Sequence, residues 1–233
     1  MIHHYPADRR YRVNHGWLQS QFSFSFAEYY DPLNMGFGPL RVLNDDVVAP
    51  GTGFGMHPHR NMEIITFVLK GELEHRDDLG NIEIMRPGII QKMTAGRGIR
   101  HSEVNPSTSE SVELLQLWIE PSTLQLDPGY EMVTYDVEQI CNQLHPVVSH
   151  QNQVGEGHIH QDTTLYLCNL DADQEIEYTL ESERRAFLFV IDGTLQINEE
   201  PIVNRRDSLR IFDESAITIK ALQQSKILFI DLP

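Results

Sequence analysis

Two short segments of the 233-residue chain carry histidine and glutamate at alternate positions. His57 and His59 flank a proline after a glycine-rich turn, and His101 lies two residues before Glu103. In an extended strand, residues i and i+2 project from the same face. If the two strands are neighbours in a small barrel, three imidazoles and one carboxylate converge inside it. This mixed nitrogen and oxygen set suits a redox-active divalent metal with room for exogenous ligands, and it lacks the thiolates of a structural zinc site.

Strand signals dominate the sequence around these segments. Short runs rich in β-branched and aromatic residues are separated by Gly, Pro, Asn and Asp about every 8–12 residues, which favours an all-β sandwich or barrel. The best helix candidate is short and spans residues 137–144. We expect strands at residues 22–26, 40–44, 62–69, 82–85, 112–119, 165–170, 187–191, 195–197 and 227–232.

The two halves of the chain contain a faint internal repeat. The segment FVLKGEL at 67–73 recurs as FVIDGTL at 189–195, and the run at 112–119 is echoed at 225–232. Two copies of one β unit, with loops of different length, would explain both matches. The repeat therefore predicts two stacked β-barrels.

The repeat also predicts that the second barrel lacks the histidine pair of the first. With an offset of 122 residues, taken from the first match, His57 and His59 correspond to Thr179 and Glu181. We place the domain limits at 1–125 and 126–233, because the stretch around this boundary contains proline and glycine.

The remaining histidines carry less information. His158 and His160 form a second His-x-His pair, but no His-x-Glu segment follows it, so we expect structural or surface histidines there. His75 and His150 have no evident partner in the sequence.

Charge and composition exclude several classes of function. The chain has 18 Lys and Arg against 34 Asp and Glu, a net charge of −16, which argues against binding to nucleic acid or to an anionic membrane. The longest apolar run, 64–69, is far shorter than the ~20 residues of a membrane helix. No apolar secretory signal precedes the first strands, and the two cysteines do not form a Cys-x-x-Cys pair. We expect a soluble protein of the reduced cytoplasm.

The motifs resemble those of the cupin superfamily and, within it, the pirin family. Both cupin motifs have counterparts in the chain, Gly51-x5-His57-x-His59-x3-Glu63 and Gly98-x2-His101-x3-Asn105. The resemblance to bacterial pirins of the quercetin 2,3-dioxygenase type is dense from about residue 10 to 120. It is carried by the segments 14–18 (NHGWL), 30–32 (YDP), 37–46, 53–59 (GFGMHPH) and 94–103 (TAGRGIRHSE).

The resemblance implies a bicupin, two cupin barrels with a metal in the N-terminal barrel only. It implies that the metal ligands are His57, His59, His101 and Glu103. Cupins in general use the first-motif glutamate, here Glu63, whereas pirins use the glutamate after the second-motif histidine, and we follow the pirin pattern. Glu63 shares strand parity with the first histidine pair, so we expect it beside the ligands. The implied metal is iron(II), with nickel, manganese, cobalt, copper and zinc left open.

The implied activity is that of a metal-dependent dioxygenase that opens the central ring of a flavonol such as quercetin with O2 and releases carbon monoxide. Glu103 is the candidate general base, and the partners are the flavonol and O2. The alternative is a non-catalytic, redox-responsive regulator that binds metal and acts through a protein partner. A ligand-sized cavity would favour the enzyme, and an acidic patch beside the metal would favour the regulator. The oligomeric state stays open, and a monomer is compatible with a bicupin.

Overall fold

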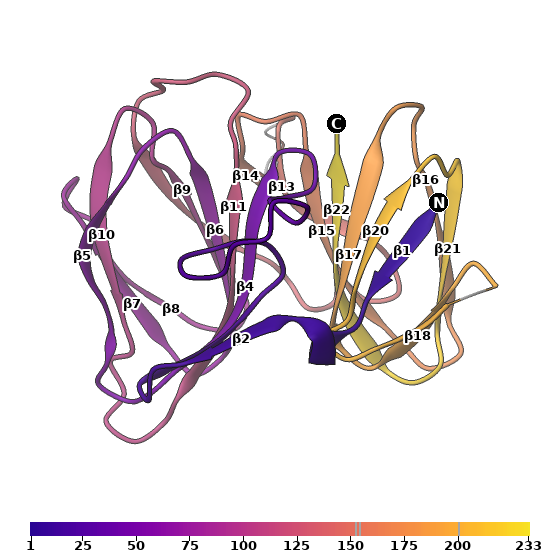
Figure 1. Cartoon of the computed structure of the whole chain (residues 1–233), viewed down its shortest axis with the longest axis horizontal. Helices are drawn as coiled ribbons and strands as arrows, with labels where there is room; N and C mark the ends of the chain where they lie inside the picture. The colour runs from indigo at the N-terminus through magenta and orange to yellow at the C-terminus, as the bar shows by residue number, and fades with distance from the viewer. Residues whose placement is uncertain (152, 154, 200) are drawn as a thin grey trace. The chain divides into compact units, whose positions relative to one another are not determined.

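The computed structural model describes residues 1–151, 153, 155–199 and 201–233, which are built almost entirely from β-strands (Figure 1). Helical structure in this described part is limited to one 3-10 turn, η1 (Ala7–Arg9), and no helix there is long and apolar enough to cross a bilayer. The all-β fold class is confirmed. The helix expected at 137–144 is wrong, because this short segment forms turns with Asn142 at a φ of 53°.

The chain folds as two compact units. The first, called the N-terminal unit, comprises residues 11–134 and 159–161. The second, called the C-terminal unit, comprises residues 1–10, 135–158 and 162–233. The two units are thus interleaved along the chain, and the expected domain limits of 1–125 and 126–233 stay a prediction.

The N-terminal unit is a sandwich of two antiparallel sheets (Figure 1). Its seven-stranded sheet consists, in order, of β12 (Gly129–Thr134), β9 (Ile89–Thr94), β6 (Glu63–Lys70), β11 (Val112–Ile119), β4 (Leu40–Val48), β3 (Leu18–Phe22) and β2 (Tyr11–Asn14). Its four-stranded sheet consists, in order, of β5 (Gly53–His59), β10 (Ile99–Val104), β7 (Leu73–Asp77) and β8 (Ile82–Met85). Val68 and Leu114 of the larger sheet share one buried cluster with Leu73 and Met85 of the smaller sheet.

The C-terminal unit also has a seven-stranded and a four-stranded sheet, antiparallel except for one parallel pair at an edge of the larger sheet. Its seven-stranded sheet consists, in order, of β1 (Ile2–Tyr5), β20 (Ser208–Phe212), β17 (Arg185–Asp192), β22 (Ser225–Leu232), β15 (Thr164–Leu170), β13 (His145–Ser149) and β14 (Gly157–His158). Its four-stranded sheet consists, in order, of β16 (Glu175–Thr179), β21 (Ala216–Ala221), β18 (Thr194–Ile197) and β19 (Ile202–Asn204). Its core is one large apolar cluster to which both sheets contribute.

Strand pairing confirms the internal repeat. β11 lies between β4 and β6, as β22 lies between β15 and β17. Gly71 connects β6 to β7 and Gly193 connects β17 to β18, with φ angles of 79° and 95°. Only glycine adopts such angles at little cost, so the two glycines fall at equivalent turns.

The aromatic run at 22–26 differs from the strand expected there. β3 ends at Phe22, and the chain leaves the sheet before Ala27, whose φ is 48°. The ring of Phe26 then packs edge-on against Trp118, with 5.3 Å between ring centroids. Phe26 lines a cavity of the N-terminal unit, whereas Phe22 and Phe24 are buried in its core. The other expected runs overlap strands of the structure.

Candidate metal centre

Three histidines from two neighbouring strands converge inside the N-terminal unit. β5 and β10 are antiparallel, with His101 directly opposite His57. The Nε2 atoms of these two residues are 3.1 Å apart. The ring centroids of His57, His59 and His101 lie 4.5–4.8 Å from one another. Three imidazoles thus present nitrogen atoms to one point, as metal binding requires.

The backbone of β5 orients His57. Gly53 allows β5 to lie close to β10, because a Cβ at this position would overlap the backbone of Glu103 and Val104. Between its pairs with His101 and Glu103, β5 carries one extra residue, a β-bulge. Within the bulge, Nδ1 of His57 lies 2.7 Å from the carbonyl oxygen of Gly55 and donates to it. Nε2 of His57 therefore keeps its lone pair for a metal.

Glu103 is a buried carboxylate held by neutral donors. Its side chain accepts from the Gln116 amide at 2.7 Å and from Thr66 and Gln91 at 3.4 Å. The indole of Trp118 donates to the Gln116 carbonyl oxygen at 3.1 Å, which directs the Gln116 amide nitrogen toward Glu103. A carboxylate buried among neutral groups lacks a counter-charge. A cation bound at the histidines would supply that charge.

The structure adds two residues that sequence reasoning missed. Ligand atoms of Glu103, His101 and His75 lie within 4.8 Å of one another, as do those of the three clustered histidines. His75 therefore does have partners, contrary to expectation. Its Nε2 lies 3.1 Å from Oδ2 of Asp77, and both side chains are fully buried. Burial opposes ionisation of Asp77, but hydrogen bonds from Asn81 and His75 outweigh it and hold the pKa of Asp77 below its ordinary value.

Burial favours the neutral form of two of the clustered histidines, His59 and His101. Burial, assisted by the neighbouring His101 and His57, lowers the pKa of His59 to about 4. Burial, with the nearby His57 and His75, lowers the pKa of His101 to about 3. Neutral imidazole is the form that binds a metal, so these histidines are ready to coordinate near pH 7.

His57 and His59 face a cavity of about 180 Å³. It is lined by Phe26, Asn44, Asp46, Phe54, His57, His59, Glu103, Gln116 and Trp118. The net pKa of Asp46 is raised to about 7, mainly by burial. The charges of Asp45 and Glu103 add to the rise, and the Ser20 hydroxyl, which donates to Asp46, opposes it. The cavity therefore combines aromatic walls with a second carboxyl group that is largely neutral below pH 7.

Glu63 makes its contacts away from His57, His59 and His101, although strand parity predicted that it would lie beside them. The turn at Asn61, where φ is 51°, separates β5 from β6 and breaks the alternation. The Glu63 carboxylate instead lies 3.1 Å from Nζ of Lys92 and 3.0 Å from Nδ1 of His160. Thr66, which contacts Glu103, is three residues away and faces the opposite side of the sheet. Glu63 thus belongs to a separate buried ion-pair cluster.

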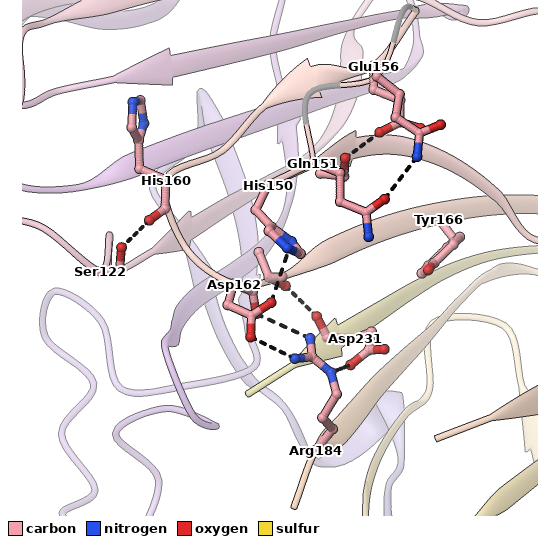
Figure 2. A network of polar contacts seen from close by, with 12 residues as sticks. Ser122, His150, Gln151, Glu156, His160, Asp162, Tyr166, Arg184 and Asp231 are labelled. Atoms are coloured by element: carbon pink, nitrogen blue, oxygen red, sulfur yellow. Dashed lines mark hydrogen bonds and ion pairs between the residues drawn. The ribbon is translucent and has the colours of Figure 1, made fainter. Parts of the chain in front are cut away.

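His160 and His150 take part in polar contacts away from the histidine cluster. His160 accepts a hydrogen bond from the Ser122 hydroxyl through its backbone oxygen, as Figure 2 shows. His150 is paired after all, because its Nδ1 lies 3.4 Å from Oδ1 of Asp162. Asp162 also accepts from Arg184 at 2.9 Å, and Arg184 donates to Asp231 at 2.6 Å (Figure 2). This network connects loops of the C-terminal unit to β22.

The C-terminal unit has tyrosine or isoleucine at the positions of His57, His101 and Glu103. Aligned on the glycine turns, the strand registers match His101 with Ile217, Glu103 with Ile219 and His57 with Tyr178. The constant offset of 122 residues matched His57 with Thr179 and is therefore wrong by one position at β5. The expectation that the C-terminal unit lacks this histidine is confirmed. By the same registers, the donors to Glu103 correspond to Leu188, Leu209 and Phe229, which are fully buried.

The contrast between the two units shows that the fold does not require polar side chains at these positions. The same strand arrangement is filled with apolar side chains in one unit and with a buried polar set in the other. Buried polar groups stabilise a fold less than well-packed apolar ones do. The polar set of the N-terminal unit is therefore best explained by a ligand rather than by stability.

Comparison with known proteins gives matches over the whole chain. The pirin family profile matches residues 6–119, and the profile of the quercetinase C-terminal cupin domain matches residues 146–232. The quercetin 2,3-dioxygenase of Escherichia coli K12 is 46% identical over 233 residues, which cover 100% of this chain and 99% of that protein. A pirin-like protein of Caulobacter vibrioides is 37% identical over 232 residues, 99% of each chain.

Solved structures also match over nearly the whole chain. The E. coli bacterial pirin YhhW in complex with nickel(II) superimposes with a TM-score of 0.95 at 44% identity, covering 100% of this chain and 99% of that one. A quercetin 2,3-dioxygenase from Acinetobacter baumannii shares the fold, with a TM-score of 0.75 at 19% identity over 98% of this chain and 85% of that one.

Proposed function

This chain belongs to the pirin family of bicupins, and we propose that it is a metal-dependent dioxygenase that opens the central ring of flavonols such as quercetin. The observation that carries the proposal is the convergence of three imidazoles beside a cavity whose lining includes a buried carboxylate. In the overall reaction, both atoms of O2 enter the product. Two carbon–carbon bonds of the central ring break, and the carbon between them leaves as carbon monoxide.

The donor set supports a divalent transition metal held by His57, His59, His101 and Glu103. The histidines offer imidazole nitrogen atoms, and the Glu103 carboxylate has no cationic partner among its hydrogen-bond donors. Iron(II) remains our proposal, and the nickel(II) of the related pirin structure shows what a close relative accommodates. When bound, the metal supplies Lewis acidity toward the flavonol oxygen and the electron-transfer chemistry that O2 needs.

The side chains of the cavity have separate tasks. Glu103 accepts the proton of the flavonol 3-hydroxyl group, for which it is placed at the cavity wall. The rings of Phe26, Phe54 and Trp118 hold the flat substrate. Pockets that enclose a whole drug-sized ligand usually measure ~300–1,000 Å³. Since this cavity measures about 180 Å³, the reacting ring enters it and the remainder of the flavonol lies at its mouth.

We extend the proposal to the C-terminal unit and to the cellular setting. Tyr178, Ile217 and Ile219 replace ligands there, so one metal binds per chain, in the N-terminal unit. The aromatic lining of the cavity beside the proposed metal site, which suits a flat ring, supports the enzyme over a regulator that acts through a protein partner. Cys141 and Cys168 are free thiols, which fits the proposed cytoplasmic location.

Anaerobic reconstitution with iron(II), followed by quercetin and air, tests the proposal. Loss of flavonol absorbance and release of carbon monoxide are measured for the wild type and for His101→Ala and Glu103→Ala. A matched control is His15→Ala, since His15 is an exposed histidine of the same unit.

We expect turnover in the wild type and the control, and none in the two site variants. Stoichiometric metal binding without turnover would exclude quercetin as the substrate. Turnover in His101→Ala equal to that of the wild type would exclude the proposed site.

A further inference from the structure

A histidine and an aspartate lie behind the proposed metal ligands, on the strand next to them. β7 pairs with β10, so His75 is opposite Glu103 and Asp77 is opposite His101. Both side chains are fully buried. The ring of His75 stacks on that of Tyr130, with 4.5 Å between centroids and 26° between ring planes. This packing holds the imidazole of His75 in one orientation.

Three distances connect these residues in a line. Oδ2 of Asp77 lies 3.1 Å from Nε2 of His75. Nδ1 of His75 lies 3.4 Å from Nδ1 of His101. On the other side of its ring, Nε2 of His101 lies 3.1 Å from Nε2 of His57, within the histidine cluster.

The direction of each hydrogen bond follows from Asp77. Its carboxylate accepts from the Asn81 amide at 2.8 Å and from the backbone N–H of Leu79 at 3.0 Å, so it is held as an acceptor. Nε2 of His75 must then donate, which leaves Nδ1 of a neutral His75 as an acceptor. Nδ1 of His101 donates to it, and Nε2 of His101 is free of protons. This is the tautomer that a metal ligand needs.

We propose that Asp77 and His75 form a hydrogen-bonded relay that fixes the tautomer of His101 and strengthens it as an electron donor to the metal. The proposal rests on the proposed role of His101 as a ligand. Asp77 and His75 are positioning residues, because they act on the metal through His101. Partners of this kind contribute ~10–100-fold to metal affinity in other metal sites.

The C-terminal unit supports the assignment. Its strand registers place Ile197 at the position of His75 and Ile217 at the position of His101, and both isoleucines are fully buried. The fold therefore does not require a histidine at either position. The relay and the ligand that it serves occur together in one unit and are replaced together in the other.

Cobalt(II) binding tests the relay without any measurement of activity. Affinity is measured by competition with a chelator, and proton NMR of the cobalt-loaded protein detects the hyperfine-shifted Nδ1 protons of the bound histidines. Asp77→Asn removes the charge at the end of the relay. The matched control, Glu83→Gln, removes the charge of an exposed residue that lies opposite His75 on β8 and makes no side-chain hydrogen bond to it in the described part of the chain.

We expect Asp77→Asn to weaken cobalt(II) binding by ~10–100-fold and to shift the His101 Nδ1 proton. The His57 Nδ1 proton, which is bonded to a backbone carbonyl, stays unchanged. Glu83→Gln binds cobalt(II) as the wild type does. His75→Phe keeps an aromatic ring against Tyr130 but removes the acceptor, so the His101 Nδ1 proton is lost to exchange.

A measurement on the unmodified protein covers the case in which these variants do not fold. In the zinc-loaded wild type, long-range proton–nitrogen spectra report which nitrogen of His75 carries a proton. Nε2 is expected, and a proton on Nδ1 would overturn the relay. If neither Asp77→Asn nor His75→Phe changes cobalt(II) binding, the relay is overturned but the assignment of His101 as a ligand is not. Binding to His101→Ala as tight as to the wild type would overturn the ligand assignment as well.

Discussion

The raised pKa of Asp46 predicts that the stability of the protein depends on pH. Its side chain is buried in the cavity wall and receives a hydrogen bond from Ser20. Burial, assisted by the charges of Asp45 and Glu103, raises the pKa of Asp46 from 3.8 to about 7 in the folded protein. Between these two pH values, the unfolded chain has lost a proton that the native protein retains. The free energy of unfolding therefore falls as the pH rises through this range.

The magnitude follows from the two pKa values. Each pH unit between about 4 and 7 lowers the free energy of unfolding by about 1.4 kcal/mol, which makes at most about 4 kcal/mol over the range. Asp46→Asn keeps the shape of the side chain and an acceptor for Ser20 but cannot ionise. We therefore expect this variant to match the wild type near pH 4 and to be more stable by up to about 4 kcal/mol above pH 7.

Urea denaturation of the metal-free protein between pH 4.5 and 8 measures this difference. Trp17 and Trp118, the two tryptophans of the chain, both lie in the N-terminal unit, so their fluorescence reports on the unit that contains Asp46. Other carboxyl groups titrate alike in both proteins and cancel in the comparison. Repeating the series with nickel(II) should reduce the difference, because a cation beside Glu103 lowers the pKa of Asp46.

A difference between wild type and Asp46→Asn that stays constant from pH 4.5 to 8 would refute the argument. It would show that Asp46 is ionised throughout this range, as it would be if water entered the cavity and solvated the carboxylate. Asp45→Asn provides the comparison for a change of charge one residue away. We expect it to alter the slope only slightly, because Asp45 is a smaller contributor than burial.

Three further substitutions have expected outcomes. Gly71→Ala lowers the free energy of unfolding, measured in urea, by about 1–3 kcal/mol, because φ is 79° and the new Cβ would lie 2.8 Å from a backbone oxygen. The control Gly16→Ala, at a φ of 82° but in open space, lowers it by about 1 kcal/mol. Equal losses of stability in the two variants would contradict this reasoning. Lys92→Met leaves the buried Glu63 without its cation and lowers the free energy of unfolding by about 3–5 kcal/mol. Adding Glu63→Gln restores most of this stability. No recovery in the double variant would show that loss of the ion pair is not the cause. Trp118→Phe frees the glutamine amide that donates to the site carboxylate and weakens nickel(II) binding by ~10-fold in a chelator competition, whereas unchanged affinity would exclude this coupling.

The strands and the histidine cluster could be predicted from short-range patterns. Alternation along one strand places His57 and His59 on a common face, and it does so for His101 and Glu103 as well. The same reasoning is wrong for Glu63, because the turn at Asn61 lies between it and the first pair and changes the parity. Alternation therefore predicts a shared face only within an uninterrupted strand.

The surroundings of the cluster depend on pairings between distant strands. His75 and Asp77 show the same alternation as the predicted ligands, but their role follows from the register of β7 against β10. Asp46 lies beside another aspartate, a pattern more typical of a solvated turn than of a buried strand. Its burial follows from the position of β4 between β3 and β11. Such long-range pairing has no local signal in the sequence.

The pairing of β1 with β20 has a consequence for biosynthesis. Ile2 lies opposite Ile211, so the edge strand of the C-terminal unit is translated some 200 residues before its partner. At about 5–20 residues per second, β1 waits on the order of 10–40 seconds without its native neighbour. During that time the N-terminal unit, whose strands lie between residues 11 and 134, can already fold on the ribosome. The metal site would then be complete before the sheet that contains β1 is closed.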